Sequence, residues 1–379
     1  MIVSVKSGIK LIGISIVTCC AVFVCTFFTN YYLDVRSLAP DAVGGMKELF
    51  DAQIVTAKFT CLITGGVLGL LTAGMLAFYI KLFIDSESKR LGMLKAMGYS
   101  SAALASRFWV FGLSVLIGAA IGHAAGFAVM PYIYKEMTIS GMPPTQIRFH
   151  AELLVALVVA PSVVFGALAC AFAAIALRRT PAELLRGERR RKHKAKQTGK
   201  ITDKPFLFEM CGATLRGKKS AVFFIAFACF CFAAMIQMGV SMFDYSGVSM
   251  SMMILSIGCV LAVVALIMAV TTVINSNKRN IAVMKAFGYS KTECSAALLA
   301  GYVPFALIGF AVGTVYQYGL MNVMINVVFK GALDMPEYGF DVSVFFIALA
   351  AFVVCYVAAM LFYSYRISKI SVKYAMSEE

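Results

Sequence analysis

Long stretches without a charged side chain recur along this chain of 379 residues and limit what it can fold into. Eight windows hold no Asp, Glu, Lys or Arg: 11–33, 59–80, 108–134, 153–177, 220–243, 245–277, 294–329 and 342–365. Each exceeds the roughly 20 apolar residues that a helix needs to cross a bilayer. With 61% hydrophobic and 14% charged residues, the chain carries more apolar surface than a soluble domain can bury. The sequence therefore predicts an all-α integral membrane protein with eight transmembrane helices.

The first window follows Lys6 and Lys10, an arrangement that a cleaved signal peptide shares. Its apolar region is longer than the roughly 7–15 residues of a signal sequence, and no clear small-x-small cleavage site follows it. We therefore expect a retained first helix.

Lysine and arginine concentrate in alternate connections between the windows. The segments 1–10, 81–107, 178–219, 278–291 and 366–379 hold 28 of the 34 basic residues. Because basic connections stay on the cytoplasmic side, the N and C termini are both predicted to be cytoplasmic. The net charge of +15 is then a topology signal and a contact with anionic membrane lipids, and no nucleic-acid partner is expected.

One short sequence motif occurs twice in the chain. The stretch Lys89–Ser100, KRLGMLKAMGYS, recurs 190 residues later as Arg279–Ser290, RNIAVMKAFGYS. Four windows in each half return the chain to its starting side, so we expect two parallel four-helix repeats. This divides the chain into a first unit at 1–180, a basic cytoplasmic linker at 181–205 and a second unit at 206–379.

The linker contains GERRRKHKAKQTGK, which is too polar to pack a core and is typical of a flexible tether. Residues 206–220 mix apolar and basic side chains, as an interfacial helix does. Within them, GATLRGKK approaches a phosphate-binding loop, but Lys219 stands where Ser or Thr must ligate magnesium. The chain is therefore not expected to bind nucleotide itself. The predicted outer connections, all too short to fold as domains, are 34–53, 136–152, 244–250 and 330–341.

Glycines four residues apart mark two windows, and this spacing lets helix backbones approach closely in lipid. The predicted helix-packing residues are Gly118, Gly122, Gly126, Gly309 and Gly313. A route for substrate is the alternative interpretation of the same glycines.

Four polar residues fall in the same windows, and we interpret them as hydrogen-bonded to neighbouring helices rather than catalytic. They are His123, Gln317, Asn322 and Asn326. No Ser/His/Asp set, Cys/His cluster or pair of intramembrane carboxylates is apparent, and the eleven cysteines lie mostly in apolar windows. Neither an enzyme, a metal site nor a proton-coupled carrier is predicted.

The repeated word resembles a motif of the FtsX-like permease family. There, the loop after a long second helix reads approximately R-x-E-I-G-x-L-K/R-A-L-G-A-S, and both Lys89–Ser100 and Arg279–Ser290 are similar to it. The family also closes each unit with a segment resembling R-x-x-P-x-E-A-L-R-x-E, which Arg178–Glu188 matches and 370–376 echoes without the proline. The resemblance covers nearly the whole chain as two tandem FtsX-like units of the MacB/LolC/BceB type, also called type VII ABC permeases.

Two features depart from the family pattern. The acidic residue of the motif is Arg90 in one copy and Asn280 in the other. The large extracytoplasmic domain of many members is absent, since only 34–53 and 244–250 stand at the corresponding places. Capture of a lipoprotein or assembly with an outer-membrane duct is therefore not carried over.

The resemblance implies a permease subunit of an ABC transporter in the bacterial cytoplasmic membrane. A separate cytoplasmic ATPase dimer would bind ATP and magnesium, and this chain would hold no cofactor. Each repeated segment would be a coupling helix docked on one ATPase, ended by a left-handed glycine. The predicted coupling residues are Arg90, Leu91, Met93, Leu94, Lys95, Met97, Gly98, Asn280, Ile281, Val283, Met284, Lys285, Phe287 and Gly288. Their repeated apolar side chains are expected to need a partner surface.

The task performed outside the cell stays open between two classes. An exporter would move a hydrophobic or amphiphilic molecule, such as a lipid or a peptide antibiotic, by mechanotransmission. A regulator would use the same stroke to control a sensor kinase or an extracellular enzyme and would transport nothing. Short outer connections favour the exporter, and the two repeats on one chain predict that a single permease chain serves both ATPases.

Overall fold

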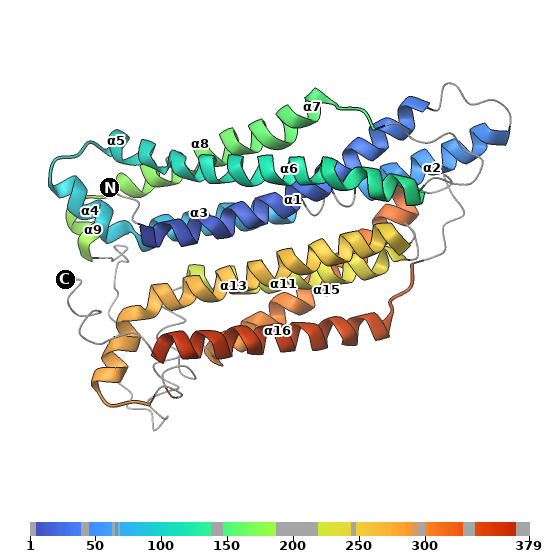
Figure 1. Ribbon diagram of the computed structural model, residues 1–379. Helices are drawn as coiled ribbons and strands as arrows, with labels where there is room; N and C mark the ends of the chain where they lie inside the picture. Colours follow the sequence, from blue (N-terminus) through green and yellow to red (C-terminus); the bar gives the residue numbers. More distant parts are fainter. Residues whose placement is uncertain are drawn as a thin grey trace.

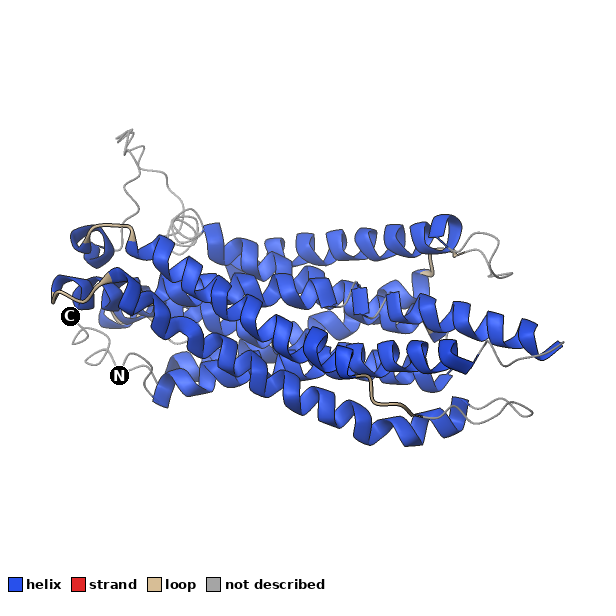
Figure 2. Cartoon of the chain, turned by 90° about the horizontal axis from the view of Figure 1, so that it is seen from above, coloured by secondary structure: helices blue, strands red, loops and turns tan. Residues whose placement is uncertain are grey.

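The computed structural model describes residues 5–38, 45–62, 65–66, 69–137, 147–186, 219–243, 248–290, 293, 300–328 and 338–368. Every element in this part of the chain is a helix, and the helices run side by side in one bundle (Figure 1 and Figure 2). The prediction of an all-α fold is confirmed for these residues.

Among the described residues, seven helical segments are long and apolar enough to cross a membrane. They are built from α1 (Val5–Leu38), α5 (Ser101–Ser106) with η3 (Arg107–Trp109) and α6 (Val110–Met137), α7 (Ala151–Leu154) with η4 (Val155–Val159) and α8 (Ala160–Leu177), α11 (Lys219–Ser241), α13 (Val248–Ala286), α15 (Val303–Val323) with η6 (Met324–Val328), and α16 (Val342–Ser368). Each overlaps one predicted window, and the chain is a multi-pass membrane protein.

The second predicted window, 59–80, is not one straight helix. α2 (Gly45–Cys61) ends inside it, the described residues Leu62, Gly65 and Gly66 are π-helical, and α3 begins at Gly69 (Gly69–Ser86). Glycine costs about 0.5–1 kcal/mol relative to Ala in a helix interior, so Gly65 and Gly66 weaken a regular α-helix here. α3 then bends by 53° into α4 (Ser88–Ala96), and counting that bent pair as one span raises the number of spans to eight.

The described residues of the predicted outer connection 34–53 are helical. α1 continues to Leu38 and α2 begins at Gly45, so the two helices form a hairpin beyond the apolar window. Gln53 Nε2 donates a hydrogen bond of 2.8 Å to Tyr31 Oη, which ties α2 to α1. We call this end of the bundle the α2 end and the opposite one the α4 end (Figure 1).

The most extensive helix–helix contact in the described first half is between α1 and α6, and glycines set its spacing. A Cβ built on Gly118 would collide with the backbone carbonyl of Ser15, and one on Gly122 with that of Cys19. Because the obstacle is backbone rather than a flexible side chain, only glycine permits this approach.

The second half repeats this arrangement between α11 and α15. A Cβ on Gly309 would collide with the carbonyl of Ala226, and one on Gly313 with that of Phe230. Ala226 and Phe230 are four residues apart on α11, as Ser15 and Cys19 are on α1. The fifth predicted packing glycine, Gly126, has ordinary contacts with Thr26, 3.4 Å from its Cβ position.

A buried hydrogen bond follows each glycine pair at matching positions. His123 comes directly after the second glycine of α6, and its Nδ1 lies 3.0 Å from Thr26 Oγ1. Thr314 comes directly after the second glycine of α15 and accepts a 2.8 Å hydrogen bond from Gln237 Nε2. In both halves the α1-type helix therefore meets the α6-type helix through the same set of positions.

The halves pack on each other reciprocally. α1 of the first half contacts α13 of the second, and α11 of the second half contacts α3 of the first. The first helix of each half therefore packs against the helix of the other half that leads into its repeated segment. The aromatic ring of Phe78 on α3 lies 5.0 Å from Phe223 and 5.3 Å from Phe227 on α11, measured between centroids. One contiguous apolar core includes residues from both halves.

Candidate coupling site

Both repeated segments fold into the same helix stop. Gly98 has a φ of +93° and Gly288 a φ of +86°, the two positive-φ residues in the described part of the chain. Behind each glycine, the tyrosine N–H donates back to the carbonyl five residues earlier: Tyr99 to Leu94 at 3.3 Å, and Tyr289 to Met284 at 3.2 Å. This is the Schellman arrangement, which satisfies carbonyls at the helix end. The left-handed conformation predicted for both glycines is present.

The serine that follows starts the next helix. Ser100 Oγ accepts a hydrogen bond of 3.2 Å from the Ala103 N–H at the start of α5. Ser290 Oγ accepts from the Glu293 N–H at 3.3 Å, and Glu293 Oε2 accepts from the Ser290 N–H at 2.8 Å, forming a capping box. The hydrogen bonds from Ser290 hold the pKa of Glu293 below its usual value. In the sequence GYS, the glycine therefore ends one helix, the tyrosine connects, and the serine caps the residues that follow.

Lys95 is bound to its own chain. Its Nζ donates to the carbonyl oxygens of Leu177 at 2.6 Å and Arg179 at 2.8 Å, at the C-terminal end of α8. Carbonyls at a helix end lack partners within the helix and carry partial negative charge, so an ammonium group suits them. Lys95 thus ties the first repeated segment to the end of α8.

The family-like closing segment completes this junction. Thr180 and Glu183 form a capping box at the start of α9 (Pro181–Arg186), with hydrogen bonds of 3.3 Å in both directions. Leu184 of α9 and Leu91 of α4 are both buried where these two helices pack. The first six residues of the predicted linker are therefore an ordered helix; 187–205 lie outside the described residues, as do 206–218 of the predicted interfacial helix.

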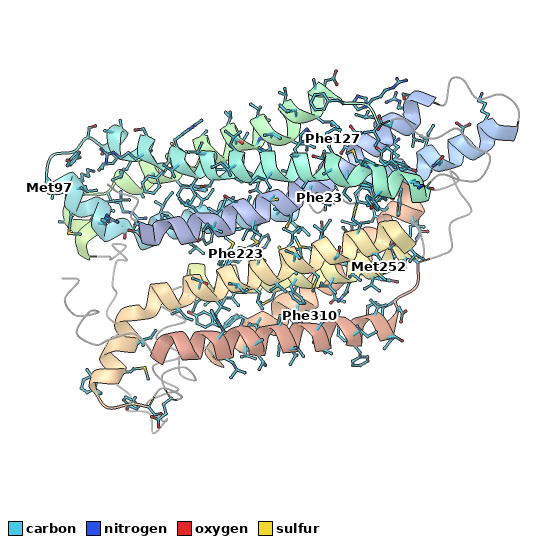
Figure 3. The ribbon with its side chains drawn as sticks, viewed as in Figure 1. Phe23, Met97, Phe127, Phe223, Met252 and Phe310 are labelled. Atoms are coloured by element: carbon cyan, nitrogen blue, oxygen red, sulfur yellow. The ribbon has the colours of Figure 1, made fainter. Side chains whose placement is uncertain are left out.

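The repeated apolar residues divide into an inward and an outward set. Leu91, Ile281 and Met284 are buried within the chain, so the expectation that they need an outside partner is wrong. Met97 is 67% exposed and Phe287 is 77% exposed, at equivalent positions of the two copies. Figure 3 places Met97 at the α4 end of the bundle, away from the core. An outside partner can reach these two side chains.

A groove of about 300 Å³ opens beside the first repeated segment. It is lined by Arg90, Met93, Leu94, Met97, Tyr99, Leu104 and Arg107. Met93 is half exposed, and an ion pair of 4.0 Å joins Arg90 to Glu87. A groove lined by two methionines and two arginines suits an apolar partner residue flanked by carboxylates. The side chains of Asn280, Val283 and Lys285 in the second copy lie outside what the structure describes.

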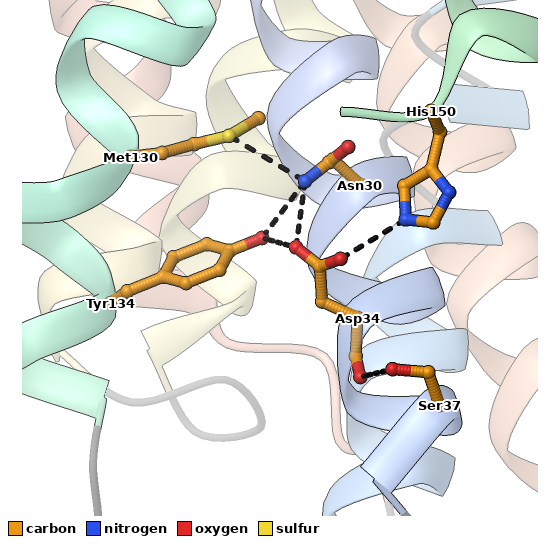
Figure 4. A network of polar contacts seen from close by, with 6 residues as sticks. All are labelled: Asn30, Asp34, Ser37, Met130, Tyr134 and His150. Atoms are coloured by element: carbon orange, nitrogen blue, oxygen red, sulfur yellow. Dashed lines mark hydrogen bonds and ion pairs between the residues drawn. The ribbon is translucent and has the colours of Figure 1, made fainter. Parts of the chain in front are cut away.

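A polar cluster at the α2 end was missed by sequence analysis (Figure 4). The buried Asp34 carboxylate accepts hydrogen bonds from Asn30 Nδ2 at 2.7 Å and from Tyr134 Oη at 3.0 Å. Its other oxygen lies 3.0 Å from His150 Nε2. The first apolar window ends one residue before Asp34, which made this carboxylate look like part of an outer connection. The i, i+4 spacing of Asn30 and Asp34 was the available signal.

The intramembrane polar residues named from the sequence make local or interhelical hydrogen bonds. Gln317 Nε2 donates to Ser241 Oγ at 3.1 Å and to Tyr338 Oη at 2.9 Å. Asn326 and Asn322 bond each other along one helix at 3.2 Å. Within the part of the chain that the structure describes, no three His, Cys, Asp or Glu side chains are grouped to hold a metal ion.

Part of the chain fits a known protein family. Residues 252–372 fit a family model described as FtsX-like permease C-terminal, a stretch that runs from α13 through α16 and contains the second repeated segment. No curated protein and no solved structure matches the chain. The match supports the FtsX-like family, whose members are membrane subunits of transport systems, for this third of the chain.

Proposed function

We propose that this protein is the permease subunit of an ABC transporter and is driven by a separate cytoplasmic ATPase dimer. The observation that carries the proposal is the repeated KAxGYS motif. Both copies end a helix at the α4 end through a left-handed glycine and the same backbone hydrogen bond. The family match at 252–372 includes one of these copies. The basic residues concentrated at this end favour a cytoplasmic location for both.

The exposed side chains define where the ATPases would dock. Met97 in the first copy and Phe287 in the second occupy the same place in the repeated word, and both are more than half exposed. Single exposed apolar side chains are common on protein surfaces, but these two stand at equivalent positions of a repeat, as two copies of one partner surface would require. We assign one ATPase subunit to each.

Each docking site is rigidly joined to the transmembrane helices in a different way. α13 runs as one helix of 39 residues into the second repeated segment, about 58 Å at 1.5 Å per residue. In the first copy, Lys95 ties α4 to the end of α8. A displacement of either docking site would therefore pass into the bundle as hinge or shear motion.

Two FtsX-like units on one chain would supply both docking sites, with eight spans in two parallel repeats. The matching α1–α6 and α11–α15 pairs and the reciprocal contacts between halves support this arrangement. The cytoplasmic ATPases would hold ATP and magnesium, and this chain would carry out no catalysis.

Export of a hydrophobic or amphiphilic molecule is the transport task that we favour. On the predicted outer side, the described residues add only the α1–α2 hairpin and the short irregular segments 147–150 and 338–341 to the bundle, which gives a client enzyme or sensor kinase little surface to bind. A regulator that transports nothing remains the second candidate. Stimulation of the complex's ATPase activity by added lipids or peptides would favour export, whereas activity unaffected by any of them but altered by a bound kinase would favour regulation.

Docking is tested by purifying the full chain from its native membrane and identifying any ATP-binding cassette protein that accompanies it by mass spectrometry. Met97→Asp with Phe287→Asp is expected to reduce the recovered ATPase at least about tenfold, since it places charge in an apolar contact. Val248→Asp is the control, because Val248 is 66% exposed at the opposite end. Lys95 is a poor test residue, because its reversal breaks hydrogen bonds within this chain. Equal ATPase recovery with the double variant and the control would refute the docking assignment.

A further inference from the structure

A short irregular segment, Ile147–His150, crosses the α2 end of the first half just before α7. Two adjacent residues of this segment contact two different helices. His150 reaches Asp34 on α1, and Phe149 lies against α6. We call this segment the first strap.

The polar contact of the first strap is anchored on a fully buried charge. The Asp34 side chain is 0% exposed, whereas the side chain of His150 is 26% exposed. One carboxylate oxygen accepts hydrogen bonds from Asn30 of α1 and Tyr134 of α6, and the other lies within hydrogen-bond distance of His150 (Figure 4). Lifting the strap would leave one oxygen of a buried carboxylate without this donor, which strongly favours the closed position.

The apolar contact covers a second buried polar group. The ring of Phe149 lies 5.5 Å from Phe127 and 6.3 Å from His123, measured between centroids. Nε2 of His123 is buried and makes no hydrogen bond, and the same holds for Oδ1 of Asn30. Release of the strap would take Phe149 away from the ring of His123, whose buried Nε2 the closed structure leaves unsatisfied.

The second half has a strap at the corresponding place but of different chemistry. Tyr338 lies shortly before α16, and its hydroxyl is 2.9 Å from both Ser241 Oγ on α11 and Gln317 Nε2 on α15. This contact joins the two helices that correspond to α1 and α6, and the three side chains that these hydrogen bonds connect are all neutral. The two outer ends are thus held by unequal contacts.

We propose that residues 147–150 are a closing strap whose release opens the α2 end of the α1–α6 pair. The contact between Asp34 and His150 holds this strap closed. The strap holds independently of whether an ATPase drives its release. The second half closes through the neutral Tyr338 contact and responds separately.

Hydrogen–deuterium exchange of the full chain in lipid nanodiscs tests whether the Asp34–His150 contact holds the strap closed, and it requires no partner protein. His150→Gln and Asp34→Asn are each expected to speed exchange of amides 148–154 roughly ten- to a hundredfold, the range for loss of one charge-assisted hydrogen bond. The double variant should add little beyond Asp34→Asn alone, because that change already replaces the carboxyl group that His150 contacts. Amides 338–345 should be unaffected.

Phe149→Ala guards against a general folding defect, since it leaves the buried carboxylate and its partners intact. It is expected to speed exchange over 148–154 by a smaller factor. The proposal is overturned if these amides already exchange at unprotected rates in the unaltered protein. Additive effects of the His150 and Asp34 changes, or equal acceleration throughout α1 and α6, would overturn it as well.

Discussion

Replacement of Gly122 by alanine tests whether backbone contact sets the α1–α6 spacing. The added Cβ would fall on the carbonyl oxygen of Cys19, which belongs to the backbone of α1 and cannot rotate away. The two helices must then separate. A gap of about 0.5–1 Å already forfeits a quarter to a half of the dispersion attraction between facing atoms.

The magnitude follows from two opposing terms. Alanine in place of glycine favours a helix by about 0.8–1 kcal/mol. Overpacking a tight contact costs typically about 1–3 kcal/mol. Gly122→Ala is therefore expected to lower the free energy of unfolding by up to about 2 kcal/mol, and Gly309→Ala should behave alike because its Cβ meets the carbonyl of Ala226.

Gly319→Ala is the matched control, since a Cβ there meets nothing within 4 Å and only the favourable helix term applies. Thermal unfolding of each variant, purified in one detergent and followed by loss of the monodisperse species, gives the ranking. We expect Gly319→Ala at or above the unaltered protein and both packing variants below it. The packing argument fails if Gly122→Ala unfolds at the same temperature as Gly319→Ala.

Three further changes address the repeated segment and the buried polar pairs. Gly98→Ala and Gly288→Ala should each destabilise by about 1–2 kcal/mol in thermal unfolding, and asparagine at either position should cost less, because it tolerates positive φ better; equal cost for both substitutions would contradict the role of φ. Lys95→Met removes two hydrogen bonds to carbonyls at the end of α8 and should raise hydrogen exchange across α9, whereas Lys95→Arg should restore part of the protection; unchanged exchange in α9 would show that the tie is dispensable. Gln237→Leu leaves the Thr314 hydroxyl without its interhelical donor and should cost about 1–2 kcal/mol, with Gln237→Leu/Thr314→Val recovering much of it; no recovery would mean that packing and not the hydrogen bond is at stake.

Local rules predicted the parts of the coupling site that depend only on neighbouring residues. A glycine after an apolar helical stretch favours a left-handed stop, and both Gly98 and Gly288 adopt it. Glycines four residues apart similarly indicated where helices approach. In each case the backbone itself requires that residue type, so the sequence pattern and the conformation are directly linked.

Contacts between distant segments could not be predicted in the same way. Lys95 looked like a charge offered to a partner, but its ammonium group binds carbonyls more than 80 residues away in the chain. Leu91 likewise looked like part of a docking surface and is buried inside the protein. A basic amphipathic stretch has the same pattern whether its apolar face meets another protein or its own chain.

The sequence by itself determined that the chain lies in a membrane, that it is all-α, and that two helices end at Gly98 and Gly288. Bilayer thickness and backbone sterics act on short stretches of sequence, so these features can be predicted locally. The tertiary structure alone decided that Met97 and Phe287 remain exposed and that Leu91, Ile281 and Met284 are already used within the chain. It also decided that Asp34 is a buried anchor held by three partners rather than an exposed charge after a helix. The physical reason is that burial and hydrogen bonding depend on which helices lie together, and that pairing joins residues about 100 positions apart.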